Sequence, residues 1–156
     1  MSIQAQRLLN VALALRESRN PDQFQMGCYV NGCGTPACAI GHYASRADLQ
    51  DLFAIRNGDD FVYADSTPDW EYGGLADYDD DRVLEHFGIT AYEAEALFGG
   101  RGCDYAKTAN EAADFIERFV KRKWGIDPAV RRLERELTTE IPTQEYVAAE
   151  LTEHSR

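Results

Sequence analysis

The stretch Cys28–His42, CYVNGCGTPACAIGH, contains three of the four cysteines, three of the twelve glycines and one of the three histidines. Thr35-Pro36 within it is a strong helix-start signal, because threonine caps helices and proline suits the first helical position. Gly34 and Gly41 permit a tight turn and a close helix contact. We therefore expect a helix to begin at Thr35-Pro36, to continue through Cys38, and to fix the centre of the fold.

The first interpretation of this stretch is structural. A reducing compartment keeps cysteines as thiols, and free cysteine commonly behaves as a small buried hydrophobic residue. The glycines and the Thr-Pro pair then shape the chain around those thiols, and His42 bonds a nearby backbone group or carboxylate. The structural motif consists of Cys33, Gly34, Thr35, Cys38 and Gly41.

A second interpretation is a zinc site. Three thiolates and one imidazole form a familiar ligand set for structural zinc. The spacing C-x4-C-x4-C-x3-H lacks the tight C-x2-C pair from which zinc sites are usually recognised, which places this reading behind the structural one. The candidate metal ligands are Cys28, Cys33, Cys38 and His42.

A third interpretation is a cysteine-dependent hydrolase. Cys38 in a first helical turn would feel the helix dipole, which lowers a thiol pKa, and His42 or His86 could serve as its base. The stretch lacks the C-G-x-C-W pattern of papain-like enzymes, and His42 on the same helix is badly directed toward Cys38. We therefore assign no catalytic residue.

Outside this stretch, helix-start signals recur along the chain. Serine and threonine cap helices, and a glutamate three residues after the threonine completes a capping box. Ser45 with Asp48 suggests a short helix through Ile55 that ends at Asn57-Gly58, and Asp77 or Asp79 can cap another through Phe87. The clearest signals are Ser2, Thr90 with Glu93, and Thr108 with Glu111, the last before the best amphipathic helix.

Between residues 59 and 74 the pattern changes to strand-forming residues: Phe61–Tyr63, then Trp70 and Tyr72. The fold class we predict is mainly α: a single compact domain of about six to eight helices, with one small β-hairpin or ordered loop near residues 59–74. Residues 1–125 form the helical core domain. Residues 126–156 form a charged helical C-terminal extension with a narrow apolar stripe that begins with Val130, Leu133 and Leu137.

The net charge of −11 opposes binding to nucleic-acid phosphates, despite a basic set around Arg118–Arg135. Acidic residues concentrate between Asp59 and Glu85. They are most simply a solvated face. A sharper hypothesis is a binding surface that imitates DNA phosphates and occupies the basic groove of another protein, formed by Asp77, Asp79, Asp80 and Asp81.

The run Cys33–His42 resembles a C-G-T-x-x-C-x-x-G-[HW] motif in small, uncharacterised bacteriophage and bacterial proteins. The similarity covers roughly residues 24–125 and includes Gly88-Ile89-Thr90, Leu97-Phe98-Gly99 and a Thr-x-x-Glu-Ala-Ala helix at Thr108–Ala113. Cys28 does not belong to the motif. The resemblance implies kinship and a phage or prophage setting, and it supplies no mechanism.

The sequence shows no signal-peptide pattern and no apolar run of about 20 residues, so we expect a cytoplasmic protein, in the host cytoplasm if phage-encoded. We predict a non-catalytic acidic binding protein that contacts another protein, such as a host protein with a basic surface, and modulates or inhibits it. The alternatives are a zinc-stabilised small module and the hydrolase. Residues 127–156 could also join copies of the chain into a homo-oligomer.

Overall fold

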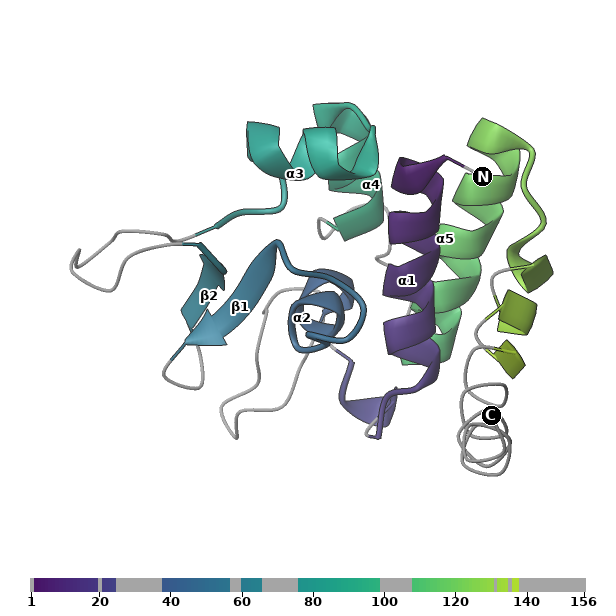
Figure 1. Cartoon of the computed structure of the whole chain (residues 1–156), viewed down its shortest axis with the longest axis horizontal. Coiled ribbons are helices and arrows are strands. Elements are labelled where there is room, and N and C mark those ends of the chain that lie inside the picture. Colours follow the sequence, from purple (N-terminus) through teal and green to yellow (C-terminus); the bar gives the residue numbers. More distant parts are fainter. Residues whose placement is uncertain are drawn as a thin grey trace, which may run out of the picture.

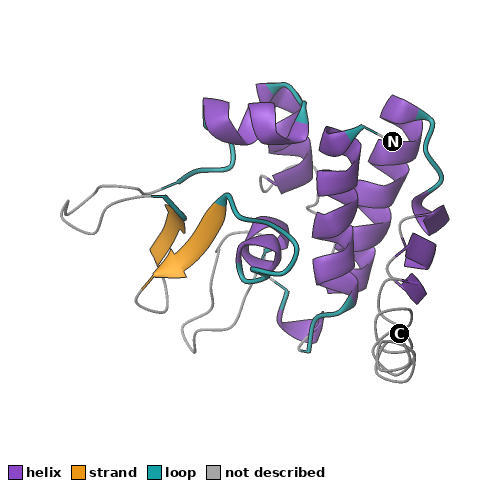
Figure 2. Ribbon diagram, viewed as in Figure 1, coloured by secondary structure: helices purple, strands orange, loops and turns teal. Residues whose placement is uncertain are grey.

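The computed structural model describes residues 2–19, 21–24, 38–56, 60–65, 76–98, 108–130, 132–134 and 136–137. The predicted mainly helical fold with one small hairpin is confirmed (Figure 2). The elements in chain order are α1 (Ile3–Arg16), the short 3₁₀ helix η1 (Pro21–Gln23), α2 (Ala39–Ala44), β1 (Phe53–Arg56), β2 (Asp60–Tyr63), α3 (Asp81–Phe87), α4 (Ala91–Phe98) and α5 (Ala109–Trp124).

Helices α1 and α5 lie side by side and form the centre of the molecule (Figure 1). The apolar stripe of α5 faces α1, and Ile116 and Val120 have no exposed surface. Helix α1 also packs against α2 and α3, which explains why every residue from Leu8 to Leu15 is buried. A helix covered on several sides is apolar on more than one face, as the run from Leu8 to Leu15 is apart from Asn10.

The predicted helix starts at the three capping signals are confirmed. Each hydroxyl accepts a bond from a backbone N–H that would otherwise lack a partner in the first helical turn. Thr90 and Glu93 form the full reciprocal capping box. The bonds are Ala5 N to Ser2 Oγ (3.1 Å), Glu93 N to Thr90 Oγ1 (3.1 Å), Thr90 N to Glu93 Oε1 (2.9 Å) and Glu111 N to Thr108 Oγ1 (3.2 Å).

The helix predicted from Ser45 to Ile55 is wrong, because residues 53–56 form strand β1. The side chain of Gln50 bonds both backbone groups of Phe53: its Oε1 accepts from the N–H (2.7 Å) and its Nε2 donates to the carbonyl (3.1 Å). These bonds take backbone groups that a helix would have used. Asn57-Gly58, predicted as the end of this helix, lies outside the described residues.

The strand predicted at Phe61–Tyr63 is confirmed, but its partner precedes it. β2 pairs antiparallel with β1 in a register that places Phe53 opposite Tyr63. The ring centroid of Phe53 lies 4.8 Å from that of Phe61 and 5.9 Å from that of Tyr63, so one face of the hairpin is aromatic and buried. Trp70 and Tyr72, the partners that the sequence suggested, lie outside the described residues.

The predicted continuous helix from Thr35-Pro36 through Cys38 is also wrong. Thr35 and Pro36 lie outside the described residues, but Cys38 has extended backbone angles (φ −93°, ψ 177°), and α2 begins one residue later. An extended residue interrupts the hydrogen bonding of a helix. Cys38 is therefore the residue that caps α2.

After α5 the chain turns at Gly125, whose φ of 70° lies in the left-handed region that favours glycine. Asp127 Oδ1 then accepts a bond from Ala129 N (3.0 Å), and the described residues between 128 and 137 are helical. Trp124 and Ile126 still pack against the core. Among the described residues, no helix has the length and apolar character needed to cross a membrane.

Candidate functional site

Cys38 and Gly41 are the two residues of the predicted structural motif that the structure describes. Cys38 is buried, and its Sγ accepts a bond from Gly41 N (3.4 Å) in the first turn of α2. A sulfur atom here performs the role that an oxygen performs in an ordinary helix cap. Cys28, Cys33, Gly34 and Thr35 lie outside the described residues.

His42 joins the start of α2 to the end of α1. Its Nδ1 lies 2.8 Å from the carbonyl oxygen of Cys38, and its Nε2 lies 3.1 Å from Ser18 Oγ. A carbonyl accepts and never donates, so Nδ1 carries the proton and Nε2 accepts from the Ser18 hydroxyl. Burial lowers the pKa of His42, although the bond to Cys38 acts in the opposite direction. The neutral imidazole thus has both nitrogens bonded to protein groups.

This geometry separates the pair on which the hydrolase interpretation depends. The accepting nitrogen of His42 faces the Ser18 hydroxyl, and its other nitrogen donates to the backbone of Cys38. A base must be within hydrogen-bond reach of the nucleophile's proton. In this arrangement His42 has no nitrogen available to deprotonate the thiol of Cys38.

The zinc interpretation involves the same histidine. Two of its four candidate ligands, Cys28 and Cys33, lie outside the described residues, and the described part of the chain contains no cluster of three metal-ligating side chains. A zinc ion bound to His42 Nε2 would have to replace the bond to Ser18. Zinc stays a hypothesis, which the metal content of protein purified without added zinc would test.

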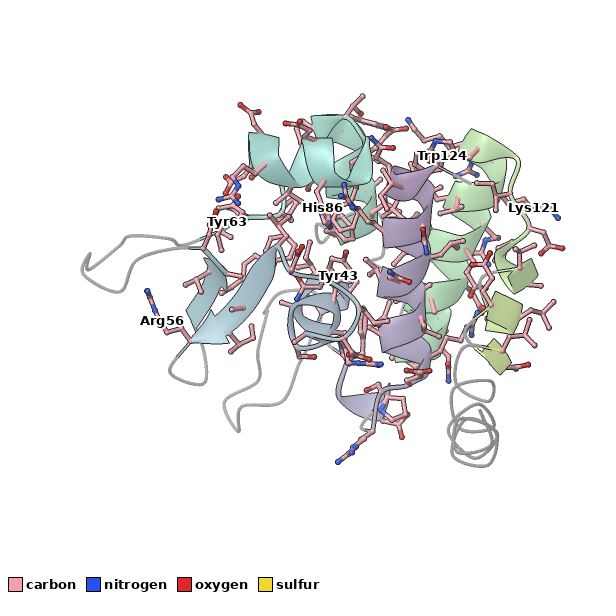
Figure 3. All side chains as sticks on the ribbon, viewed as in Figure 1. Tyr43, Arg56, Tyr63, His86, Lys121 and Trp124 are labelled. Atoms are coloured by element: carbon pink, nitrogen blue, oxygen red, sulfur yellow. The ribbon has the colours of Figure 1, made fainter. Side chains whose placement is uncertain are left out.

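A second buried histidine contact links α2 to α3. The hydroxyl of Tyr43, which is fully buried, lies 2.8 Å from His86 Nε2, and Arg7 Nη1 donates to the His86 carbonyl (2.9 Å). Figure 3 shows Tyr43 and His86 close together beside α1. Burial, together with the nearby guanidinium of Arg7, lowers the pKa of His86 to about 4. Burial also raises the pKa of Tyr43, so both groups are neutral near pH 7.

The sequence did not predict this pairing. His86 was considered as a base for Cys38, whereas in the structure it lies among the rings of Tyr43, Phe53 and Phe87. Its ring centroid is 4.8 Å from that of Phe87 in an edge-on geometry. His86 and Phe87 follow Val83 by three and four residues, the spacing of a single helix face, and this is the signal that could have indicated burial.

The four aspartates of the predicted binding surface have different environments. Asp80 Oδ2 accepts from the Tyr63 hydroxyl (2.7 Å) and from Asp77 N (3.0 Å), and Asp77 Oδ1 accepts from Tyr78 N (2.8 Å). Asp80 is also the cap residue of α3, so the predicted caps Asp77 and Asp79 are wrong. Asp79 and Asp81 are exposed. Asp80 therefore connects β2 to α3, and the outer acidic surface is smaller than predicted.

Arg82, the base within the acidic stretch, neutralises a neighbouring aspartate. Its two terminal nitrogens bond both carboxylate oxygens of Asp65 at 3.1 Å, and its guanidinium lies 4.1 Å from the centre of the Tyr63 ring. Hydrogen bonding to Arg82 lowers the pKa of Asp65. The exposed carboxylates that remain along α3 belong to Asp79, Asp81 and Glu85.

Two described residues of the predicted basic set bond acids on neighbouring elements. Lys123 Nζ lies 2.9 Å from Glu93 Oε1, and Arg132 Nη1 lies 2.7 Å from Glu117 Oε2. Glu117 also bonds Arg16 of α1 (2.9 Å). Arg118, Lys121 and Arg122 are exposed, and Figure 3 shows Lys121 projecting from α5. The basic set therefore contributes more to internal ion pairs than the sequence suggested.

The described residues of 128–137, which we call the C-terminal segment, expose their apolar side chains. Val130, Leu133 and Leu137 are 43%, 57% and 54% exposed. They lie three and four residues apart, so they form one stripe along a helix. The contact between Arg132 and Glu117 shows that the polar side of the segment faces α5. The sequence predicted the stripe but did not predict that it faces away from the core.

Comparison of the chain with protein-family models, with curated proteins and with solved structures gives no match.

Proposed function

We propose that this protein acts by binding another protein through the apolar stripe of the C-terminal segment. The observation that carries the proposal is the exposure of Val130, Leu133 and Leu137 on a segment whose charged side is bonded to α5. Three large apolar side chains in one row are the pattern with which an amphipathic helix enters the groove of a partner.

The energy available from this stripe is sufficient to matter. Fully burying a valine or leucine side chain contributes about 1.5–3 kcal/mol. About half of each of the three side chains is exposed, so covering them offers on the order of 3 kcal/mol before the costs of association. The stripe is therefore the anchor of a larger interface, whose remaining contacts surround it.

The setting of the proposed interaction comes from the resemblance to small phage and bacterial proteins. We expect a partner in the host cytoplasm whose activity the protein modulates or inhibits. The proposed mode of action is non-catalytic, since the described histidines bond structural neighbours. Binding to a surface of another protein requires no reactive group on this chain.

Affinity purification from a bacterial lysate tests the proposal. Wild-type protein is compared with a variant carrying Leu133→Asp and Leu137→Asp, and with the control Tyr92→Asp, which changes an 85% exposed aromatic residue on α4. We expect proteins captured by wild type and by the control to be lost from the stripe variant. Circular dichroism verifies that all three proteins are folded. Identical captured proteins from all three would overturn the proposal.

A second candidate function uses the acidic side of α3 as an imitation of DNA phosphates. The supporting observation is that Asp79, Asp81 and Glu85 are exposed and that their carboxylates bond no other group in the described part of the chain. Changing these three residues to Asn or Gln should abolish binding to a basic groove and leave the melting temperature unchanged. Asp80 is left intact because it bonds Tyr63. Retained binding would reject this function.

A further inference from the structure

The acidic residues of the C-terminal segment flank its stripe. Successive residues of an α-helix are rotated by roughly 100°, which places Glu134 and Glu136 roughly 65–95° from the centre of the stripe, one on each side. Both are exposed. By the same geometry Arg132 lies roughly 130° away, in agreement with its bond to Glu117 on α5. The described part of the segment thus presents apolar side chains between carboxylates and turns Arg132 inward.

The carboxylates beside the stripe disfavour some of the molecules that could bind to it. A second copy of the segment would bring Glu134 and Glu136 of one chain close to the same residues of the other, in either a parallel or an antiparallel pairing. Like charges beside an apolar seam disfavour that pairing. Anionic surfaces would be repelled for the same reason, and the net charge of −11 adds to both effects.

We infer that the occupant is a basic amphipathic helix: a helical segment of another protein with apolar side chains at i, i+3 and i+7, flanked by lysine or arginine. The apolar side chains pack on Val130, Leu133 and Leu137, and the bases lie opposite the flanking carboxylates. This inference names the partner chemistry of the proposed function and rests on it. Exposed charge pairs of this kind change the association rate and the salt dependence more than the final affinity.

Synthetic peptides test the inference with the full-length protein. One helical peptide has a leucine stripe flanked by lysines, and a matched peptide has the same stripe flanked by glutamates. Fluorescence anisotropy should show that the lysine peptide binds at least about tenfold more tightly. Its affinity should fall as the salt concentration rises from about 0.05 to about 0.5 M, because salt screens exposed charges.

Three variants separate the stripe from the general acidity of the chain. Leu133→Asp should abolish binding of the lysine peptide, and Glu134→Gln with Glu136→Gln should weaken it severalfold. Asp22→Asn with Asp51→Asn, which removes equal charge from exposed positions outside both candidate surfaces, should leave binding unchanged. Equal binding of the two peptides, or equal binding of the lysine peptide to wild type and Leu133→Asp, would overturn the inference.

The outcomes also distinguish this inference from the proposed function. If Leu133→Asp releases captured lysate proteins but the lysine peptide does not bind, the stripe is a binding site for a different partner chemistry. If light scattering shows a dimer of wild type that Leu133→Asp dissociates, the occupant is a second copy and the inference is wrong. Failure of both the capture and the peptide experiments rejects the stripe as a docking site.

Discussion

Helix α5 and the C-terminal segment have the same kind of sequence and opposite burial. Both are amphipathic and rich in charge, yet Ile116 and Val120 of α5 are fully buried, whereas Leu133 and Leu137 are more than half exposed. The difference lies in their neighbours: α5 packs its apolar side on α1, and the segment turns its charged side to α5. An amphipathic pattern therefore indicates that a face needs a partner without identifying the partner.

Glu117 is the residue at which the two regions meet. Its carboxylate bonds Arg16 of α1 and Arg132 of the segment, and its side chain is 13% exposed. The Arg132 side chain is 45% exposed, and ion pairs near the surface contribute about 0–1 kcal/mol, so its bond to Glu117 orients the segment more than it stabilises the fold. Burial of apolar side chains stabilises the core, whereas an ion pair orients the C-terminal segment.

The largest expected effect comes from shortening a buried side chain of α5. Ile116→Ala removes part of a fully buried side chain beside α1, and cavity formation adds to the lost burial. We expect a loss of about 2–5 kcal/mol in the free energy of unfolding, measured by urea denaturation. A loss below about 1 kcal/mol would show that the α1–α5 contact is less tightly packed than described.

A smaller effect separates the two left-handed glycines that end α3 and α5. A Cβ on Gly88 (φ 63°) would lie 2.8 Å from Gln4 Cγ, whereas one on Gly125 (φ 70°) would have no neighbour within 4 Å. The backbone conformation alone costs about 1–2 kcal/mol in each alanine variant. Gly88→Ala should therefore lower the melting temperature more than Gly125→Ala. Equal shifts would show that Gln4 moves aside without cost.

The pH dependence of stability should come from a buried histidine of the core, His86. The pKa of His86 falls from its ordinary value of 6.5 to about 4 on folding, chiefly through burial. Between these values the unfolded chain binds a proton that the folded chain does not, so stability is full above pH 6.5 and falls as the pH drops toward 4. We expect a loss of about 1–2 kcal/mol, allowing for the water that still reaches the ring.

Denaturation of wild type and His86→Gln at a series of pH values measures this contribution. Glutamine can still accept a bond from the Tyr43 hydroxyl but does not titrate. Burial also lowers the pKa of His42, so the loss of stability at low pH that His42 causes should remain in both proteins. Identical pH profiles would show that His86 does not contribute.

The smallest effect completes the comparison. Leu133→Ala shortens an apolar side chain that is 57% exposed, so the free energy of unfolding should change by less than about 0.5 kcal/mol. The same change in α5, Ile116→Ala, should cost several times more. A loss from Leu133→Ala comparable to that from Ile116→Ala would mean that the stripe packs within the chain.

The sequence predicted what local chemistry decides. The caps at Ser2, Thr90 and Thr108 need atoms within three residues, and all three form. The helix prediction for residues 45–55 was wrong because their apolar spacing suits either a helix or a strand. The bond between the Gln50 side chain and the backbone N–H of Phe53 forms at the start of the strand and decides between the two.

The candidate site depended on contacts that the sequence does not contain. The bonds between Tyr43 and His86, and between Arg132 and Glu117, join residues far apart in the chain. The acidic stretch was visible in the sequence, but the separation of Asp80 from Asp79 and Asp81 required the position of the Tyr63 hydroxyl. Whether a carboxylate bonds a neighbouring element or faces solvent depends on the direction in which its side chain points, which the sequence does not give.

The position of Trp124 gives the molecule an intrinsic optical reporter. This half-buried indole ends α5, one residue before the turn into the C-terminal segment, with its ring 6.2 Å from that of Phe119 and 5.6 Å from the ammonium of Lys123 (Figure 3). Indole emission responds to nearby charge and hydration, so movement of the segment should change its wavelength. With the second tryptophan, Trp70, changed to phenylalanine, unlabelled protein could report occupancy of the stripe in real time.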